Sequence, residues 1–188
     1  HGHQVWKTQP AKMAAYEGLF ESEKNPTLMV FGIIDREERK VHFPIGIPNF
    51  MSIFLDFNPE TVIQGLNEFP EEDWPPLPLT FYPFHLMTLL GFYFVGLTGL
   101  GLLLLWRGML FSSRWFMRLL YLSIPLPFIA NELGWIAAEV GRQPGVVVGV
   151  EGMRTALVAS PSVSAGEILA SLIMFAIFYA LMFVLWLF

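Results

Sequence analysis

The sequence predicts an all-α integral membrane protein: three transmembrane helices preceded by an extramembrane loop region that contains a short β-hairpin. The composition is 54% hydrophobic and only 14% charged, with a positive mean hydropathy. A soluble domain of 188 residues is rarely so apolar. Three segments, 81–106, 115–140 and 167–188, are each long enough to cross about 30 Å of hydrocarbon as a helix. All three lie far from the N-terminus, so none resembles a cleaved signal peptide.

The chain divides into an extramembrane region, residues 1–78, and a membrane region, residues 79–188. The first region holds 12 of the 16 acidic residues against six lysines and arginines, and nine of the 14 prolines. A helix is expected to begin at Thr8-Gln9-Pro10. Thr8 would cap this helix, and Pro10 suits its first turn. This composition predicts an ordered region and not a disordered tail.

Strand and helix patterns alternate through the rest of the extramembrane region. The β-rich runs 27–34 and 41–47 flank the charged turn DREERK, which predicts a hairpin. Short amphipathic helices are expected over residues 52–57 and 59–69. Residues 68–78 are then too rich in proline for regular structure, and we expect a stiff lead into the membrane.

The charge pattern predicts the orientation of the membrane region. The turn 107–114 between the first two helices carries two arginines, with Arg118 just beyond it and no acid nearby. By the positive-inside rule this turn is cytoplasmic, so residues 1–78 face outward. The link 141–164 then also lies outside, although it carries two arginines that a bound anion would have to hold.

Glycines and prolines shape the expected spans. The first helix contains four glycines that allow close approach of neighbouring helices: Gly91, Gly96, Gly99 and Gly101. Pro125 and Pro127 remove backbone donors in the second helix, which should kink and free carbonyl groups. Three helices cannot shield buried charges from lipid by themselves, so the chain is expected to be part of a larger helical bundle. A start at His1 without Met and an apolar end suggest that both termini are cut.

The most informative stretch is NELGWIAAEVGRQP, residues 131–144. Glu132, Trp135, Glu139 and Arg142 follow one another at spacings of three, four and three, so they share one helical stripe. Ionisable groups in a membrane cost at least a few kcal/mol each unless they are paired, protonated or bound. The stripe is therefore a candidate functional site, although Glu132 could also bond a carbonyl freed at the kink.

Metal-binding patterns are sparse in this chain. Cysteine is absent, which excludes disulfides and thiolate sites. The four histidines have no metal-ligand spacing: His1, His3, His42 and His85. Metal chemistry would therefore need a cofactor.

Three ordered motifs resemble one protein family. NELGWIAAEVGRQP resembles the GWxxxExGRQPW signature of subunit I of the cytochrome bd-type quinol oxidases, and QPAKMAAYEG resembles the start of that subunit's quinol loop. GLNEFPEEDWPP resembles the GLDxFPPEDRPP stretch of members with a short quinol loop, including the cyanide-insensitive branch. Met87 precedes Glu139 by 52 residues, as the family's two heme-binding residues do. The resemblance covers the C-terminal half of the subunit, with the last three of nine transmembrane helices.

The resemblance implies roles for the substrate-binding and heme-binding residues. Lys12 and Glu17 match the residues of the loop that interact with quinol. Met87 matches the axial iron ligand of a low-spin heme b, a role that suits a thioether. Glu139 matches the carboxylate at the iron of a high-spin heme b.

The same resemblance assigns the remaining residues of the site. Trp135 matches the indole between the low-spin heme and the heme pair, and Arg142 and Gln143 match the arm beside that pair. Two positions depart from the family pattern. His85 stands where many members have an arginine near the low-spin heme, and Gly145 replaces the final tryptophan of the signature. The third heme is left open between heme d and a further heme b.

The resemblance also implies partners and location. We expect the N-terminal half of subunit I, on the same or a separate chain, together with subunit II, small subunits, quinol and membrane lipid, and no nucleic acid. The location is the prokaryotic cell (inner) membrane, with residues 1–78 on the periplasmic side. The family's heme-ligating histidines belong to the N-terminal half, so this chain alone should be inactive.

Two other classes of function stay open beside a quinol oxidase that reduces O₂ to water and generates a proton gradient. A proton-relaying transporter or channel component could use Glu132 and Glu139 without a cofactor. A non-catalytic assembly subunit would also lack heme. On sequence alone, Met87 could be ordinary packing, and Lys12 and Glu17 could be solvated surface charges. A visible absorption spectrum separates these classes.

Overall fold

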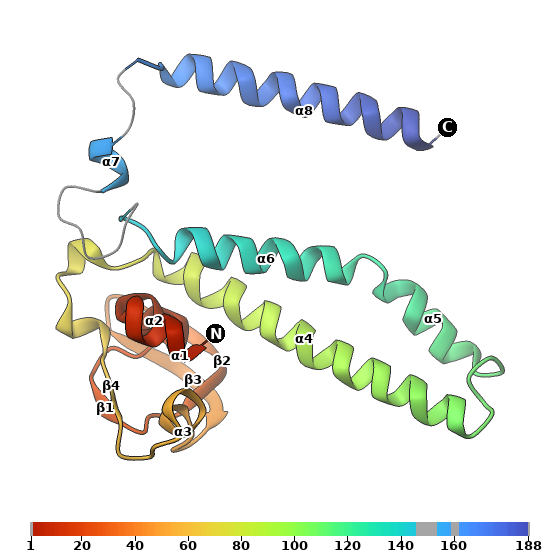
Figure 1. Ribbon diagram of the computed structural model, residues 1–188, viewed down its shortest axis with the longest axis horizontal. Coiled ribbons are helices and arrows are strands. Elements are labelled where there is room, and N and C mark those ends of the chain that lie inside the picture. Colours follow the sequence, from red (N-terminus) through yellow and green to blue (C-terminus); the bar gives the residue numbers. More distant parts are fainter. Residues whose placement is uncertain (1, 146–153, 159–161, 188) are drawn as a thin grey trace.

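The computed structural model describes residues 2–145, 154–158 and 162–187 (Figure 1). The first expected span is helix α4 (Leu77–Trp106) and the third is α8 (Ala165–Leu187). The second is built from α5 (Arg114–Ser123) and α6 (Leu126–Val140). All three spans are long and apolar enough to cross a membrane, which confirms the predicted fold class. A four-residue helix, α7 (Thr155–Val158), lies in the link before α8.

The second span bends where the prolines predicted it. Helix α5 ends at Ser123, and α6 begins at Leu126 with prolines in and just before its first turn. Pro125 has no N–H to donate, so the regular hydrogen-bond ladder cannot continue through it. The kinked span runs back alongside α4, whereas α8 stands apart from both (Figure 1).

Only one of the four glycines of α4 makes a close helix contact within the described residues. A Cβ atom at Gly101 would lie 3.2 Å from the ring of Phe116 in α5. At Gly91, Gly96 and Gly99 a Cβ atom would meet nothing within 4 Å in the described part of the chain. The expected close approach at those three positions is therefore not made by this chain's own described helices.

The extramembrane region begins with two short helices, α1 (Gly2–Thr8) and α2 (Pro10–Glu17). The prediction that Thr8 caps a helix was wrong. Thr8 is instead the last residue of α1, and its hydroxyl donates to the carbonyl of Gln4 at 2.9 Å. Gln9 precedes α2 without a side-chain cap, and Pro10 opens α2 as expected.

The predicted hairpin is confirmed. Strand β2 (Leu28–Asp35) pairs antiparallel with β3 (Lys40–Ile47), and Asp35 lies opposite Lys40 at the turn. The short helix expected after it is α3 (Met51–Asp56). A second small sheet pairs β1 (Glu23–Lys24) with β4 (Val62–Ile63).

The prediction of a helix over residues 59–69 was wrong. This segment contains β4 and a 3₁₀ turn, Leu66–Glu68. The reason is tertiary: the N–H groups of Leu66 and Asn67 donate to the carbonyls of Leu19 and Phe20, both at 2.9 Å. The backbone comes so close there that a Cβ atom at Gly65 would lie 2.4 Å from the backbone of the neighbouring segment. In a helix, the N–H groups of Leu66 and Asn67 would instead donate to carbonyls of the same helix.

Residues 68–78 are also more regular than expected. They contain a 3₁₀ turn, Glu71–Asp73, and α4 already begins at Leu77. Proline is tolerated in the first turn of a helix because its missing N–H has no partner there anyway. Pro78 therefore belongs to α4 and does not precede it.

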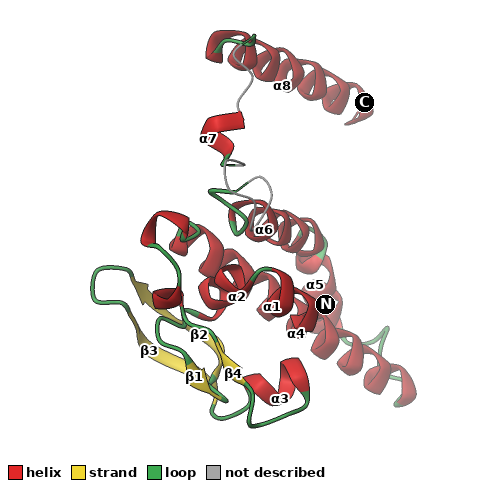
Figure 2. Ribbon diagram, turned by 60° about the vertical axis from the view of Figure 1, so that its left-hand side comes forward, coloured by secondary structure: helices red, strands yellow, loops and turns green. Residues whose placement is uncertain are grey.

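The main core of the extramembrane region lies where α2, the hairpin and the first turns of α4 meet (Figure 2). Its buried members are Ala14, Ala15, Phe20, Ile34, Leu66, Trp74, Leu77 and Phe81. A smaller cluster under α3 contains Met13, Met51, Leu55 and Ile63. The membrane helix α4 thus supplies part of the core of the extramembrane region.

Replacing Phe81 tests this shared core. Phe81 is 0% exposed, so Phe81→Ala should destabilise the extramembrane region by about 3–5 kcal/mol and lower the thermal unfolding midpoint of the purified complex. Phe57→Ala makes the same change at a side chain that is 90% exposed, and should cost no more than about 0.5 kcal/mol. Equal midpoints for the two variants would contradict the placement of Phe81 in the core.

Candidate functional site

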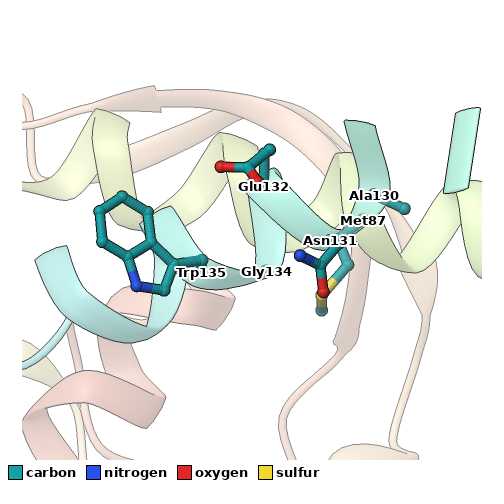
Figure 3. Close-up of a pocket in the computed structure, with 6 residues that line it drawn as sticks. All are labelled: Met87, Ala130, Asn131, Glu132, Gly134 and Trp135. Carbon is teal, nitrogen blue, oxygen red and sulfur yellow. The ribbon is translucent and has the colours of Figure 1, made fainter. Parts of the chain in front are cut away.

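An open pocket lies between α4 and α6, with a volume of about 570 Å³. Its lining residues are Met87, Ala130, Asn131, Glu132, Gly134 and Trp135 (Figure 3). Met87 comes from α4 and the other five from α6. The pocket therefore brings together three sequence-predicted site residues: a thioether, a carboxylate and an indole.

Gly134 permits the contact that forms this pocket. A Cβ atom at Gly134 would lie 2.7 Å from the sulfur of Met87. Real Cβ atoms do not approach that closely, so any larger residue would displace the Met87 side chain. Gly134 is the glycine of the GW pair in the motif, but it was not named as a site residue on the sequence.

The other half of the predicted stripe lies at the end of α6. Glu139 forms an ion pair with Arg142, one turn further along the chain. Both side chains are about two-fifths exposed, so the pair fixes geometry more than it adds stability. Beyond it, the amide oxygen of Gln143 accepts a hydrogen bond from the hydroxyl of Thr155 at 2.6 Å. Glu139 and Arg142 do not line the pocket that contains Met87.

The second arginine of the link after α6 is also paired with carboxylates. Arg154 lies 3.1 Å from Glu72 and 2.7 Å from Asp73. The hydrogen bond to Arg154 lowers the pKa of Glu72, and the bond to Glu72 raises the pKa of Arg154. Acidic side chains of this chain therefore accompany both arginines of the link after α6.

Helix α2 contacts the end of α6 through two side chains. The ammonium group of Lys12 donates to the carbonyl of Ala138 at 2.9 Å, and the hydroxyl of Tyr16 donates to the carbonyl of Ala137 at 3.1 Å. Burial is the main cause that lowers the pKa of Lys12, followed by the charge of Arg142. Burial also raises the pKa of Tyr16 to about 12. Tyr16 was missed on the sequence, although its spacing of four from Lys12 places both on one helical face.

Glu17 points in a different direction from Lys12. Its carboxylate accepts a hydrogen bond from the backbone N–H of Met29 at 2.8 Å, inside the extramembrane region. The residue is 6% exposed, and this burial raises the pKa of Glu17 to about 7, against a smaller lowering by the Met29 bond. The two residues matched to quinol binding therefore share one helix but face different partners.

His85 lies on the side of α4 that packs into the extramembrane region. It is 1% exposed and its ring lies 4.2 Å from that of Phe81, centroid to centroid. Nδ1 lies 2.9 Å from the carbonyl of Phe81, so it carries the proton and donates there. Nε2 has no hydrogen-bond partner among the described residues. His85 does not line the pocket that contains Met87.

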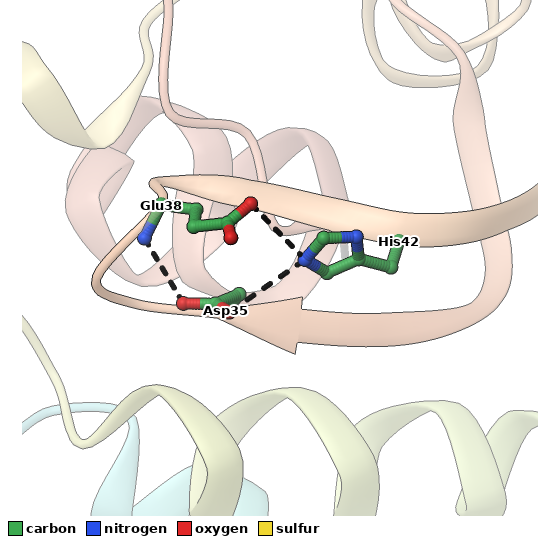
Figure 4. Close-up of side chains that lie close together, drawn as sticks. All are labelled: Asp35, Glu38 and His42. Atoms are coloured by element: carbon green, nitrogen blue, oxygen red, sulfur yellow. Dashed lines mark hydrogen bonds and ion pairs between the residues drawn. The ribbon is translucent and has the colours of Figure 1, made fainter.

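A separate cluster lies at the hairpin turn (Figure 4). Nε2 of His42 is 3.6 Å from Asp35 and 3.5 Å from Glu38, and the three ligand-type atoms lie within 4.8 Å of one another. The backbone N–H of Glu38 is the main cause that lowers the pKa of Asp35. Lys40 also pairs with Glu38. The hydrogen bonds and ion pairs of the turn account for this cluster, and we assign it no ligand.

Comparison with known proteins identifies the chain as a whole. The family model for cytochrome bd terminal oxidase subunit I matches residues 1–188. The chain belongs to this family. It is 34% identical to the cytochrome bd ubiquinol oxidase subunit 1 of Bacillus subtilis, over 95% of the chain and 40% of that protein. It is 30% identical to the cytochrome bd-II ubiquinol oxidase subunit 1 of Escherichia coli, over 57% of the chain and 20% of that protein.

The fold agrees with this family assignment. The structure of bd oxidase from Geobacillus thermodenitrificans superposes with a TM-score of 0.78 at 34% identity, over 97% of this chain and 41% of that one. The resemblance read from the motifs is thereby confirmed, as is the place of the three spans within a larger helical bundle. This cytochrome bd subunit I chain spans about two-fifths of the length of the relatives from Bacillus subtilis and Geobacillus thermodenitrificans.

The chemistry of the pocket in this cytochrome bd subunit I chain fits a heme edge. A thioether sulfur is a soft ligand that suits heme iron, and the lining is mostly apolar apart from Asn131 and Glu132. No histidine is among the six lining residues. Met87 is therefore the one lining side chain of a type that commonly ligates heme iron, and any second axial ligand would come from elsewhere.

The pKa of Glu17 leads to a testable pH dependence. The folded pKa of about 7 lies above the ordinary 4.5, so the folded state is most favoured below pH 4.5. Stability should then fall by up to about 3 kcal/mol as the pH rises to 7 and beyond. Thermal unfolding midpoints of the wild-type complex should decrease over this range, and Glu17→Gln should flatten the decrease. The same slope in both proteins would contradict the burial of an ionisable Glu17.

Proposed function

We propose that this chain is the quinol-loop and heme-binding part of a respiratory quinol oxidase of the cytochrome bd type. The observation that carries the proposal is the position of the Met87 sulfur in the pocket between α4 and α6, beside Glu132 and Trp135. Membership of the family supplies the reaction class: oxidation of quinol with reduction of O₂ to water. A proton relay without a cofactor has no need of a thioether at this place.

Five residues would serve the hemes. Met87 would hold a low-spin heme b through its sulfur, and Glu139 would hold a high-spin heme b through its carboxylate. On α6, Trp135 lies between Glu139 and Gly134, the residue that contacts Met87. Arg142 and Gln143 follow Glu139 and would donate to heme propionate groups. When bound, the hemes supply one-electron transfer and the reduction of O₂; the third is a heme d or a further heme b. The protein's part is to fix the ligands and exclude water.

The residues of α2 would serve quinol. Oxidation of quinol releases protons, and a carboxyl group with a pKa of about 7 both accepts and releases a proton near neutral pH. Glu17 is therefore suited to proton uptake from quinol, and Lys12 to hydrogen bonding of a quinol oxygen. His85 stands where many members of the family have an arginine near the low-spin heme. Because its Nδ1 already donates to the carbonyl of Phe81, its Nε2 would donate to a propionate group only when the ring is protonated.

The remaining assignments concern the membrane and partners. The arginine-bearing turn between α4 and α5 faces the cytoplasm of a prokaryotic cell, and residues 1–78 face the periplasmic side. The spans expose apolar surfaces, and we assign part of this surface to contacts with the N-terminal half of subunit I and with subunit II. The reaction then contributes to a proton gradient, because protons from quinol leave on the outer side.

A reduced-minus-oxidised visible spectrum of the purified membrane complex tests the whole proposal. We expect bands of a low-spin heme b, a high-spin heme b and a third heme, together with quinol-dependent O₂ consumption. A complex without any heme would overturn the proposal in favour of a proton relay or an assembly subunit.

Met87→Leu tests the low-spin heme. Leucine has a similar volume, so the fold should survive, whereas the sulfur ligand is removed. The low-spin signal should change to high-spin and quinol oxidation should cease. Met182→Leu makes the same change in α8 and should leave the spectrum unaltered. A persistent low-spin signal in Met87→Leu would show that another group ligates this heme.

Glu139→Gln tests the high-spin heme. The amide keeps the shape but removes the charge, so the high-spin heme b should be lost or lowered in occupancy while the low-spin heme remains. Glu37→Gln at the exposed hairpin turn is the matched control and should retain both signals. Full heme content and normal O₂ reduction in Glu139→Gln would exclude the ligand role of this carboxylate.

A further inference from the structure

Tyr16 joins the extramembrane region to both helices of the candidate site. Its ring stacks on Phe84 of α4 with the centroids 4.2 Å apart and the planes 7° from parallel. Its hydroxyl donates to the carbonyl of Ala137 in α6 at 3.1 Å. The residue is 8% exposed, so both contacts are shielded from water. One side chain therefore contacts the helix of Met87 and the helix of Glu139.

The carbonyl that Tyr16 bonds lies two residues before Glu139. The same oxygen also accepts the N–H of Gly141 at 3.0 Å. Because this oxygen already accepts its helical bond, the Tyr16 hydroxyl uses its second lone pair and fastens the final turn from outside the helix. Orientation of this turn sets the direction in which the Glu139 side chain leaves the helix.

A second bond on the same face supports this function of α2. Lys12 donates to the carbonyl of Ala138, the next one along. The stem of Lys12 packs against Gly141, where a Cβ atom would lie only 3.0 Å from the lysine side chain. Two adjacent carbonyls of α6 are thus bound by two side chains one turn apart on α2.

We propose that Tyr16 is a positioning residue, which holds the end of α6 against α2 and so directs Glu139 toward its heme. This inference rests on the proposed function, because it takes Glu139 as a heme ligand. It adds a link between the two sites: α2 also carries Lys12 and Glu17, the residues assigned to quinol. A displacement of α2 on quinol binding would be transmitted to the Glu139 turn through the Tyr16 hydroxyl.

Tyr16→Phe removes one oxygen atom and keeps the ring that stacks on Phe84. In the purified membrane complex we expect the low-spin heme signal to stay at its wild-type value. The high-spin heme b should shift its absorption band and midpoint potential, or fall at least about twofold in occupancy, because its ligand is less firmly directed. Backbone amide hydrogens at the end of α6, including that of Gly141, should exchange several-fold faster.

Tyr93→Phe is the matched control. The hydroxyl of Tyr93 lies 2.5 Å from that of Ser123, and so joins α4 to α5 well away from Glu139. This variant also loses one tyrosine hydrogen bond between elements, here a part-buried one to a hydroxyl, yet should leave the high-spin heme and the exchange at the end of α6 unchanged. An equal spectral change in both variants would overturn the specific role of Tyr16.

The remaining outcomes separate this inference from the proposed function. Wild-type spectra and unchanged amide exchange in Tyr16→Phe would overturn the positioning role while leaving the oxidase assignment intact. Loss of all hemes together with the complex would show a general structural role and also overturn it. A wild-type complex without heme would overturn the oxidase proposal and, with it, the direction of Glu139 toward a heme.

Discussion

The arrangement depends on one helix that serves two environments. The first turns of α4 contribute Leu77 and Phe81 to the core of the extramembrane region, and the following turns bring Met87 against Gly134 of α6. In the first contact, full burial of a large apolar side chain contributes about 1.5–3 kcal/mol to the stability of the fold. The second contact then forms the pocket. Packing of the extramembrane region therefore sets the position of the turn of α4 that carries Met87.

Charges near the C-terminal end of α6 affect geometry more than stability. The pairs of Arg142 with Glu139, and of Arg154 with Glu72 and Asp73, join partly exposed side chains. Such exposed pairs contribute little to stability. The pair of Arg142 with Glu139 is local to the end of α6, whereas Arg154 ties the link after α6 to the segment before α4. Glu139 is thereby already surrounded by positive charge from Arg142 and Lys12.

Much of the fold followed from the sequence because it depends on local patterns. Apolar length predicted the spans, Pro125 predicted the bend, and alternation around DREERK predicted the hairpin. The failures have two different causes. Thr8 ends α1, and its hydroxyl bonds Gln4 in that helix instead of capping α2. Residues 59–69 have a helix-like local pattern, but their backbone groups find distant partners, as when Leu66 donates to Leu19. Such long-range hydrogen bonds leave no periodic trace in the sequence.

The candidate site divides in the same way. Met87 and Glu139 could be named because they belong to motifs with fixed spacing, and the family assignment supports those motifs. Tyr16 could not, because its partner is a backbone carbonyl 121 residues further along the chain. Every residue has a backbone carbonyl, so the residue type at position 137 does not indicate the contact. The spacing of four between Lys12 and Tyr16 indicated a shared face, but not what that face would meet.

The shared use of α4 has a consequence for exchange of parts between relatives. The boundary between water and lipid does not coincide with a boundary in packing, since Phe81 lies beyond the start of the span and is wholly buried against residues that precede it. A chimera that joins the loop region of one relative to the helices of another at Leu77 would divide a single core between two parents. A chimera joined after the second turn of α4 would keep that core intact. Natural recombination between relatives is subject to the same constraint.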